Sequence, residues 1–121
     1  MQKALRVLLV DDNEALRENL VECLEEEGHL VAQARDGQEA LGQLARAERP
    51  DVLVVDLVMP GLSGREVAAA VRRDPVLRDL RVVLMTGRDV NLAKCTEFDA
   101  VLTKPFGLPE LLAAVRRGEP A

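Results

Sequence analysis

The sequence predicts an α/β domain built on a doubly wound, five-stranded parallel sheet. Short apolar runs of strand length recur along the chain, and segments with the apolar spacing of helices lie between them. Such alternation favours parallel strands joined by right-handed crossovers, with helices on both faces of the sheet. A hydrophobic fraction of 48% with 2% aromatic residues requires a core of Val, Leu and Ala, which suits a sheet covered by helices.

The expected strands are short, and the first and third are apolar almost throughout. They span residues 5–10, 30–34, 52–55, 80–85 and 100–102. A strand that is buried on both faces needs a near-continuous apolar run. We therefore expect the first and third strands at the centre of the sheet.

The expected helices carry apolar residues at intervals of three and four. In the first, Leu16, Leu20 and Leu24 are spaced four apart, and Gly28 follows as a C-terminal stop. Pro109 suits the first turn of the last helix, with which the chain closes. The expected helices span residues 14–27, 38–47 and 65–73, and the last begins at 109.

Length and charge limit the classes of protein to consider. With 121 residues, the chain is expected to form a single domain over 1–121, with 117–121 as a candidate start of a linker. A net charge of −5 argues against direct nucleic-acid binding, which normally needs a basic face. Every apolar run is far shorter than the roughly 20 residues that cross a bilayer, so no membrane span is expected.

The cysteines and the histidine suggest no metal or redox motif. Cys23 and Cys95 lack motif spacing, and no export signal precedes them, so we expect reduced thiols in a cytoplasmic protein. His29 has no second histidine with which to complete a metal site. We expect it to be an exposed residue at the start of a strand.

Polar side chains stand where the expected strands end. Asp11 and Asp12 follow the first strand, Asp56 ends the third, Thr86 ends the fourth and Lys104 follows the fifth. In an open parallel sheet the ligand site lies beyond the carboxyl ends of the strands, so these groups should converge. Three carboxylates that lie close together repel one another unless a cation neutralises them or one of them takes up a proton. A hard divalent ion such as Mg²⁺ meets that need with oxygen ligands.

Taken singly, these residues have simpler explanations. Asp12 or Asn13 can cap the helix that follows the first strand. Thr86 can be a turn residue, and Lys104 can be a surface lysine. Their joint placement at the ends of separate strands favours a site.

Four segments resemble the signature segments of response-regulator receiver domains of bacterial two-component systems, the CheY-like superfamily. They are LLVDDNE at 8–14, DVLVVDLVMPGLSG at 51–64, VVLMTGR at 82–88 and VLTKPF at 101–106. The resemblance covers essentially the whole chain. It implies a flavodoxin-like sheet with strand order 2-1-3-4-5, whereas the residues themselves indicate only the alternation of strands and helices.

The resemblance also implies the chemistry of the site. Asp56 would accept a phosphoryl group from a histidine kinase or a phosphotransfer protein. Asp11 and Asp12 would hold Mg²⁺ together with Asp56 and the backbone carbonyl of Val58. Mg²⁺ would offset the charge of the attacking carboxylate and of the phosphoryl oxygens.

Further residues take their expected roles from the same resemblance. Lys104 would add positive charge, and its bond to Pro105 resembles the family's cis-proline turn. Thr86 would hydrogen-bond a phosphoryl oxygen after transfer, which is the family's switching step. Gly61 and Gly64 would lie in the loop before the third helix.

The function expected from this resemblance is phosphorylation-controlled signalling, with an output protein or domain that the sequence does not identify. The chain would catalyse only its own phosphorylation and dephosphorylation, so it is not expected to be a conventional enzyme. A phosphatase with an aspartate nucleophile would need a second acid two residues after Asp56, where this chain has Val58. The alternative is a pseudo-receiver that acts only as a protein-interaction module.

The sequence departs from the family pattern near the fifth strand. Many receivers carry Tyr or Phe where this chain has Val101, and Phe98 is out of register with that position. The stretch from 86 to 104 is about four residues shorter than is usual in the family, so we expect a shortened fourth helix near 91–96. Val58 and Arg88 flank the expected path of attacking water, and an apolar Val58 favours a long-lived phosphoryl-aspartate.

Overall fold

The computed structural model describes residues 4–46, 48–87 and 96–116. Its elements in chain order are β1 Arg6–Val10, α1 Glu14–Glu26, β2 Leu30–Ala34, α2 Gly37–Arg46, β3 Val52–Asp56, α3 Gly64–Arg73, β4 Arg81–Thr86, β5 Ala100–Thr103 and α4 Leu108–Arg116. All strand pairs are parallel, and the sheet has the order β2-β1-β3-β4-β5. The predicted fold class and strand order are therefore confirmed.

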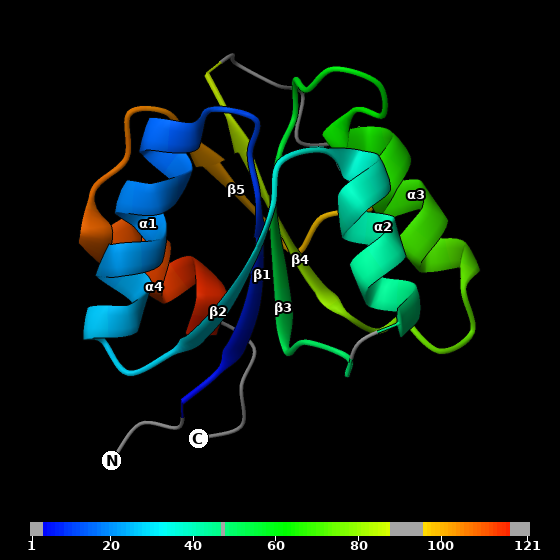
Figure 1. Ribbon diagram of the computed structural model, residues 1–121, viewed down its shortest axis with the longest axis horizontal. Coiled ribbons are helices and arrows are strands. Elements are labelled where there is room, and N and C mark those ends of the chain that lie inside the picture. Colours follow the sequence, from blue (N-terminus) through cyan, green and yellow to red (C-terminus); the bar gives the residue numbers. More distant parts are fainter. Residues whose placement is uncertain (1–3, 47, 88–95, 117–121) are drawn as a thin grey trace.

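Helices cover both faces of the sheet, with α1 and α4 on one face and α2 and α3 on the other (Figure 1). Each pair of helices packs on its own hydrophobic cluster of sheet residues. Every residue of β3 is buried, and in β1 only Arg6 is exposed. The prediction that the first and third strands are central is confirmed, since β1 and β3 pair with each other inside the sheet. Among the described helices, none is long and apolar enough to span a membrane.

Capping interactions explain where α1 and α3 begin, and a glycine explains where α1 ends. Asn13 caps α1, and its side-chain oxygen accepts a hydrogen bond of 3.0 Å from the backbone N–H of Leu16. Gly28 adopts φ 91° just after the helix, which agrees with its predicted role as a stop. Ser63 and Glu66 form a capping box at the start of α3. The expectation that Gly64 lies in the preceding loop is wrong, because this capping box makes Gly64 the first residue of α3.

The expectation of an exposed His29 is also wrong. Only 3% of the residue is exposed, and its Nδ1 atom accepts a hydrogen bond of 3.0 Å from the backbone N–H of Leu5. The turn after α1 places the ring near the start of β1. There it accepts a hydrogen bond from the backbone N–H of the residue just before the strand. An isolated histidine gave no sequence signal for that contact.

The shortened fourth helix expected near 91–96 falls mainly outside the described residues. Of this range the structure describes only Thr96, which lies in a turn. The candidate linker at 117–121 also lies outside them. The helix labelled α4 in Figure 1 is the one expected from Pro109 onward. Phe98 and Val101 pack against the same hydrophobic cluster, on the α2 and α3 side of the sheet.

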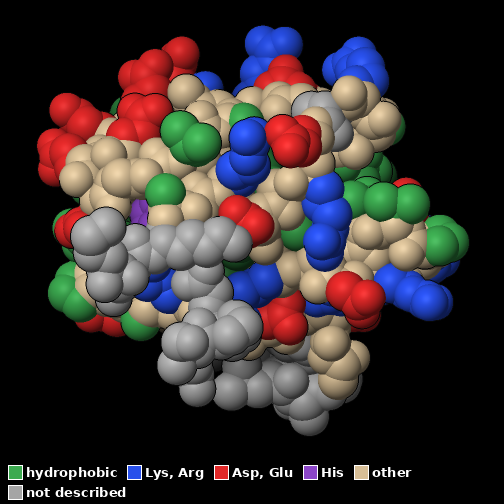
Figure 2. All heavy atoms as spheres, turned by 90° about the horizontal axis from the view of Figure 1, so that it is seen from below, with side chains coloured by type: hydrophobic (Ala, Val, Ile, Leu, Met, Phe, Trp, Pro, Cys, Tyr) green, Lys and Arg blue, Asp and Glu red, His purple; other side chains and the backbone are tan. Residues whose placement is uncertain are grey.

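Arg72 fixes the amino ends of β4 and β5. The Arg72 guanidinium donates to the carbonyl oxygens of Arg78, Leu80 and Glu97, at 2.8, 2.6 and 2.7 Å. It also forms an ion pair of 3.1 Å with Asp99. Figure 2 looks at this end of the molecule and shows acidic and basic side chains interspersed across it. The buried part of this end is therefore held by the contacts of Arg72 with carbonyl oxygens and with Asp99.

Candidate functional site

The structure brings the five polar residues expected at the strand ends to one edge of the sheet. Asp11 and Asp12 follow β1, Asp56 is the last residue of β3, Thr86 is the last residue of β4, and Lys104 follows β5. Asp11, Asp56 and Thr86 are buried, while Asp12 is exposed. The site therefore combines a closed floor with one carboxylate that faces solvent.

The three carboxylates form a tight cluster. One oxygen from each of Asp11, Asp12 and Asp56 lies within 4.8 Å of the others. Lys104 Nζ lies 3.2 Å from Asp11 Oδ2 and 3.2 Å from Asp56 Oδ1, so one ammonium group is shared by two carboxylates. Among the described residues, the side chain of Asp12 has no ion-pair or hydrogen-bond partner. Negative charge therefore exceeds positive charge within the cluster.

The pKa values of Asp56 and Lys104 follow from their burial and from these charges. Burial raises the pKa of Asp56, repulsion by Asp11 raises it further, and the attraction of Lys104 only partly opposes these effects. Burial alone would lower the pKa of Lys104, but the attraction of Asp11 and Asp56 outweighs burial and raises it. The lysine therefore stays charged, and the Asp56 carboxylate remains short of positive charge.

Backbone contacts hold Lys104 and Asp56 at this edge. The backbone N–H of Lys104 donates to the carbonyl oxygen of Thr86 at 2.7 Å, which ties β5 to the end of β4. The peptide bond between Lys104 and Pro105 is cis, as the family resemblance implied. The N–H of Leu57 donates to the carbonyl oxygen of Met85 at 2.9 Å and extends the ladder just past Asp56.

Gly64 has a role at the site that the sequence did not reveal. A Cβ atom at this position would lie 2.5 Å from the backbone carbonyl oxygen of Asp56. Only a residue without a side chain allows the start of α3 to approach β3 so closely. The sequence signal was a glycine after a turn, which did not distinguish a loop from a close contact.

Asn13, the cap of α1, and Arg17, within α1, fix the loop that carries Asp11 and Asp12. The N–H of Asn13 donates to Asp11 Oδ1 at 2.9 Å, and Arg17 Nη1 donates to the carbonyl oxygen of Asp11 at 2.8 Å. Because Asn13 is the helix cap, the simpler explanation of Asp12 as a cap does not hold. Sequence reasoning missed Arg17, since its contact with Asp11 depends on how α1 packs beside β1.

The chemistry of the donor set fits a hard divalent cation. Carboxylate oxygens are the ligands that Mg²⁺ and Ca²⁺ prefer, and Mg²⁺ commonly takes one or two carboxylates and keeps several waters. The exposed Asp12 leaves one side of the cluster open to such waters. Val58 follows β3 by two residues and is 58% exposed.

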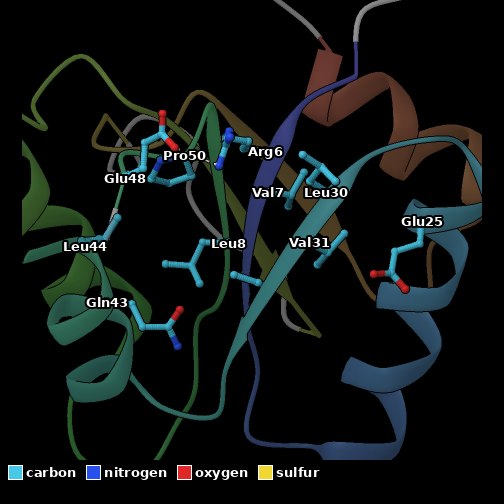
Figure 3. A pocket seen from close by; sticks show the side chains of 11 residues that line it. Arg6, Val7, Leu8, Glu25, Leu30, Val31, Gln43, Leu44, Glu48 and Pro50 are labelled. Carbon is cyan, nitrogen blue, oxygen red and sulfur yellow. Dashed lines mark ion pairs between the residues drawn. The ribbon is translucent and has the colours of Figure 1, made fainter. Parts of the chain in front are cut away.

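A hollow of about 330 Å³ lies away from this site, beside the edge strand β2 (Figure 3). Apolar side chains of β1 and β2 form its floor, and Glu25 and Glu48 lie on opposite sides of it. Arg6 pairs with Glu48 at 3.1 Å. The described residues that line the hollow form no cluster of metal-ligating groups, so the carboxylate cluster is the better candidate for function.

Comparison with known proteins places these features in a family. The family model described as response regulator receiver domain matches residues 7–116. The response regulator MprA of Mycobacterium leprae is 43% identical over 116 residues, which cover 93% of this chain and 50% of that protein. The chain thus spans about half the length of this relative.

Two solved structures are also similar. The response regulator TrrA of Thermotoga maritima, in complex with Mg²⁺-BeF, superposes with a TM-score of 0.84 at 33% identity and covers 93% of this chain and 96% of that one. The chemotaxis response regulator CheY4 of Vibrio cholerae gives a TM-score of 0.85 at 31% identity, covering 95% of this chain and 98% of that one.

Proposed function

Because this chain belongs to the response regulator receiver domain family, we propose that it is a signalling receiver whose Asp56 accepts a phosphoryl group from a histidine kinase or a phosphotransfer protein. The observation that carries the proposal is the surplus of negative charge around Asp56. A buried, ionised carboxylate beside two others, with one shared lysine, is stabilised when further positive charge binds.

The metal assignment has the same basis. Asp11, Asp12 and Asp56 would hold Mg²⁺ through carboxylate oxygens, and the backbone carbonyl of Val58 would complete the protein ligands. The relative TrrA, solved with Mg²⁺-BeF, supports the choice of ion. When bound, Mg²⁺ offsets the negative charge of the attacking carboxylate and of the phosphoryl oxygens.

Three side chains, those of Asp56, Lys104 and Thr86, would then each have a role in the transfer. An oxygen of Asp56 forms the new bond to phosphorus, while the P–N bond to the donor histidine breaks and its electron pair leaves on the imidazole nitrogen. Lys104, already 3.2 Å from Asp56 Oδ1, supplies fixed positive charge next to the phosphoryl group. The hydroxyl of Thr86, at the end of the neighbouring strand, would donate to a phosphoryl oxygen after transfer.

The partners and the surrounding protein are part of the proposal. Residues 1–121 form a single receiver domain in the cytoplasm, which acts on an output protein or domain, and 117–121 are the candidate start of a linker. The length of the relative MprA, of which this chain covers half, supports a further segment. Val58 gives the aspartyl phosphate a long lifetime, since its apolar side chain offers no group to orient a water for attack. Arg88, the other position expected beside the path of that water, lies outside the described residues.

Intact-protein mass after treatment with acetyl phosphate tests the proposal. With Mg²⁺ present, the wild-type chain is expected to gain one phosphoryl group, and removal of Mg²⁺ with a chelator is expected to prevent the gain. Asp56→Asn provides the matched control, because it keeps the size of the side chain and removes the nucleophile. A folded wild-type chain that gains no mass would favour a pseudo-receiver that only binds proteins.

A further inference from the structure

The Arg17 guanidinium connects three parts of the fold next to the carboxylate cluster. Arg17 lies in the first turns of α1 and is half-buried. Its Nη1 atom donates to the carbonyl oxygen of Asp11 at 2.8 Å, and its Nε atom donates to Gln33 Oε1 at 3.0 Å. The side chain therefore ties the loop after β1 to both α1 and β2.

The contact with Asp11 also affects Asp12. The carbonyl group that Arg17 holds belongs to the peptide unit that joins Asp11 to Asp12. Because a peptide unit is planar, fixing its carbonyl oxygen also fixes the direction in which the chain enters Asp12.

Asp12 depends on this backbone contact more than Asp11 does. The Asp11 carboxylate is held directly, by the N–H of Asn13 at 2.9 Å and by Lys104 at 3.2 Å. Among the residues that the structure describes, nothing holds the Asp12 carboxylate through a hydrogen bond or an ion pair. Its place in the cluster, within 4.8 Å of the other two carboxylates, therefore depends on the backbone.

We propose that Arg17 is a positioning residue for the metal site, which orients the peptide unit between Asp11 and Asp12 so that Asp12 presents its carboxylate to a divalent cation. The inference rests on the proposed function, which assigns Mg²⁺ to this cluster. Arginine suits the task because its planar guanidinium places Nε and Nη1 on two acceptors at once, whereas a lysine offers a single nitrogen.

Orientation and charge have opposite effects on Mg²⁺, which makes the inference testable. A positive charge beside the site repels a cation, so through charge alone the loss of Arg17 would tighten Mg²⁺ binding. Through positioning, the loss of Arg17 would weaken it. The variants Arg17→Gln and Arg17→Lys separate the two effects, because the first removes the charge and the second keeps it.

The experiment measures the Mg²⁺ dissociation constant of the unphosphorylated full chain by calorimetric titration. Both variants are expected to bind Mg²⁺ about tenfold more weakly than wild type, the lower end of what loss of a supporting contact costs a metal site. Tighter binding by Arg17→Gln, or wild-type affinity in Arg17→Lys, would overturn the inference. A wild-type chain that binds no Mg²⁺ would instead overturn the metal site itself, and the inference with it.

Arg35→Gln is the matched control. Arg35 follows β2 at the same end of the sheet, is exposed, and pairs with Glu39 at 3.3 Å rather than with the Asp11 loop. Its loss removes the same charge without touching the peptide unit, so the Mg²⁺ affinity is expected to stay at the wild-type value. A tenfold weakening in this control would attribute the Arg17 effect to something other than its contacts.

A second variant and a second readout guard against a general loosening of the fold. Gln33→Met removes one of the two acceptors of Arg17 and is expected to give an affinity between those of wild type and Arg17→Gln. In phosphorylation by acetyl phosphate, the Mg²⁺ concentration for half-maximal rate should rise by the same factor as the dissociation constant. A fall in the maximal rate at every Mg²⁺ concentration, with no change in that midpoint, would contradict the positioning role.

Discussion

The two ends of the parallel sheet treat charged side chains in opposite ways. At the amino ends of β4 and β5, Arg72 donates to three carbonyl oxygens and pairs with Asp99. Asp99 also accepts a hydrogen bond of 2.7 Å from the N–H of Val82. Arg72 and Asp99 thus have partners that reduce the free-energy cost of their partial burial.

At the carboxyl ends of the strands, the carboxylates outnumber the positively charged groups of the cluster. Lys104 is shared by Asp11 and Asp56, and Asp12 adds a further negative charge. The raised pKa of Asp56, caused first by burial and then by repulsion from Asp11, reflects this shortage. The comparison teaches that the contacts of Arg72 and Asp99 stabilise one end of the sheet, while the carboxylate cluster at the other end has a cost in stability, as is common at functional sites.

The largest expected effect is on the end that Arg72 and Asp99 stabilise. Arg72→Ala removes the donor of three carbonyl oxygens and leaves the Asp99 carboxylate with only the N–H of Val82, so the free energy of unfolding should fall by about 2–4 kcal/mol. Chemical denaturation monitored by circular dichroism measures the change. Arg73→Ala is the control, since Arg73 is the next residue of α3 and is exposed; it should change stability by less than about 0.5 kcal/mol. Equal losses in both variants would remove the distinction between the two ends.

The next effect concerns the close approach at the end with the carboxylate cluster. Gly64→Ala places a Cβ atom against the Asp56 carbonyl oxygen, so it should destabilise the fold by about 1–3 kcal/mol and lower phosphoryl uptake. Gly42→Ala is the control, because its added Cβ would meet the end of the flexible Arg46 side chain at 3.3 Å. That variant should be neutral or stabilising by up to about 1 kcal/mol. A Gly64→Ala protein with wild-type stability and wild-type uptake would show that the close contact does not constrain Asp56.

The smallest expected effect is a gain in stability. In the absence of Mg²⁺, Asp56→Asn should raise the free energy of unfolding at neutral pH by about 1 kcal/mol, because it removes a charge that lacks compensation. Chemical denaturation of both proteins in chelator measures the difference. A less stable variant would contradict the idea that the site accepts a cost in stability.

The pH dependence of that gain follows from the raised pKa of Asp56. The folded protein binds the Asp56 proton more tightly than the unfolded chain, so the ionised carboxylate destabilises the fold only above the unfolded pKa of about 4. The advantage of Asp56→Asn should therefore be absent below about pH 4 and should grow as the pH rises through the folded pKa. Denaturation at a series of pH values tests this, and an advantage that does not change with pH would contradict it.

The sequence predicted the sheet, its central strands and the residues at the strand ends, because these depend on local features. A buried strand is apolar throughout, and a polar residue at its end is visible in the sequence of that strand alone. The positions of Asp11, Asp56 and Thr86 could be read in this way.

The contacts that the sequence did not predict depend on tertiary packing. Arg17 reaches Asp11 only because α1 packs beside β1. A side chain at position 64 is excluded only because α3 begins against β3. His29 is buried because the turn after α1 places its ring near the N–H of Leu5. None of these contacts has a characteristic spacing along the chain.

The most direct test of the central claim is the free energy of unfolding as a function of Mg²⁺ concentration, in wild type and in Asp56→Asn. If the carboxylate cluster lacks positive charge and binds Mg²⁺, wild type should gain about 1.4 kcal/mol at ten times the dissociation constant. Asp56→Asn, which has lost one ligand and one charge, should gain much less at the same Mg²⁺ concentration. Equal gains in the two proteins, or no gain in wild type, would contradict the account.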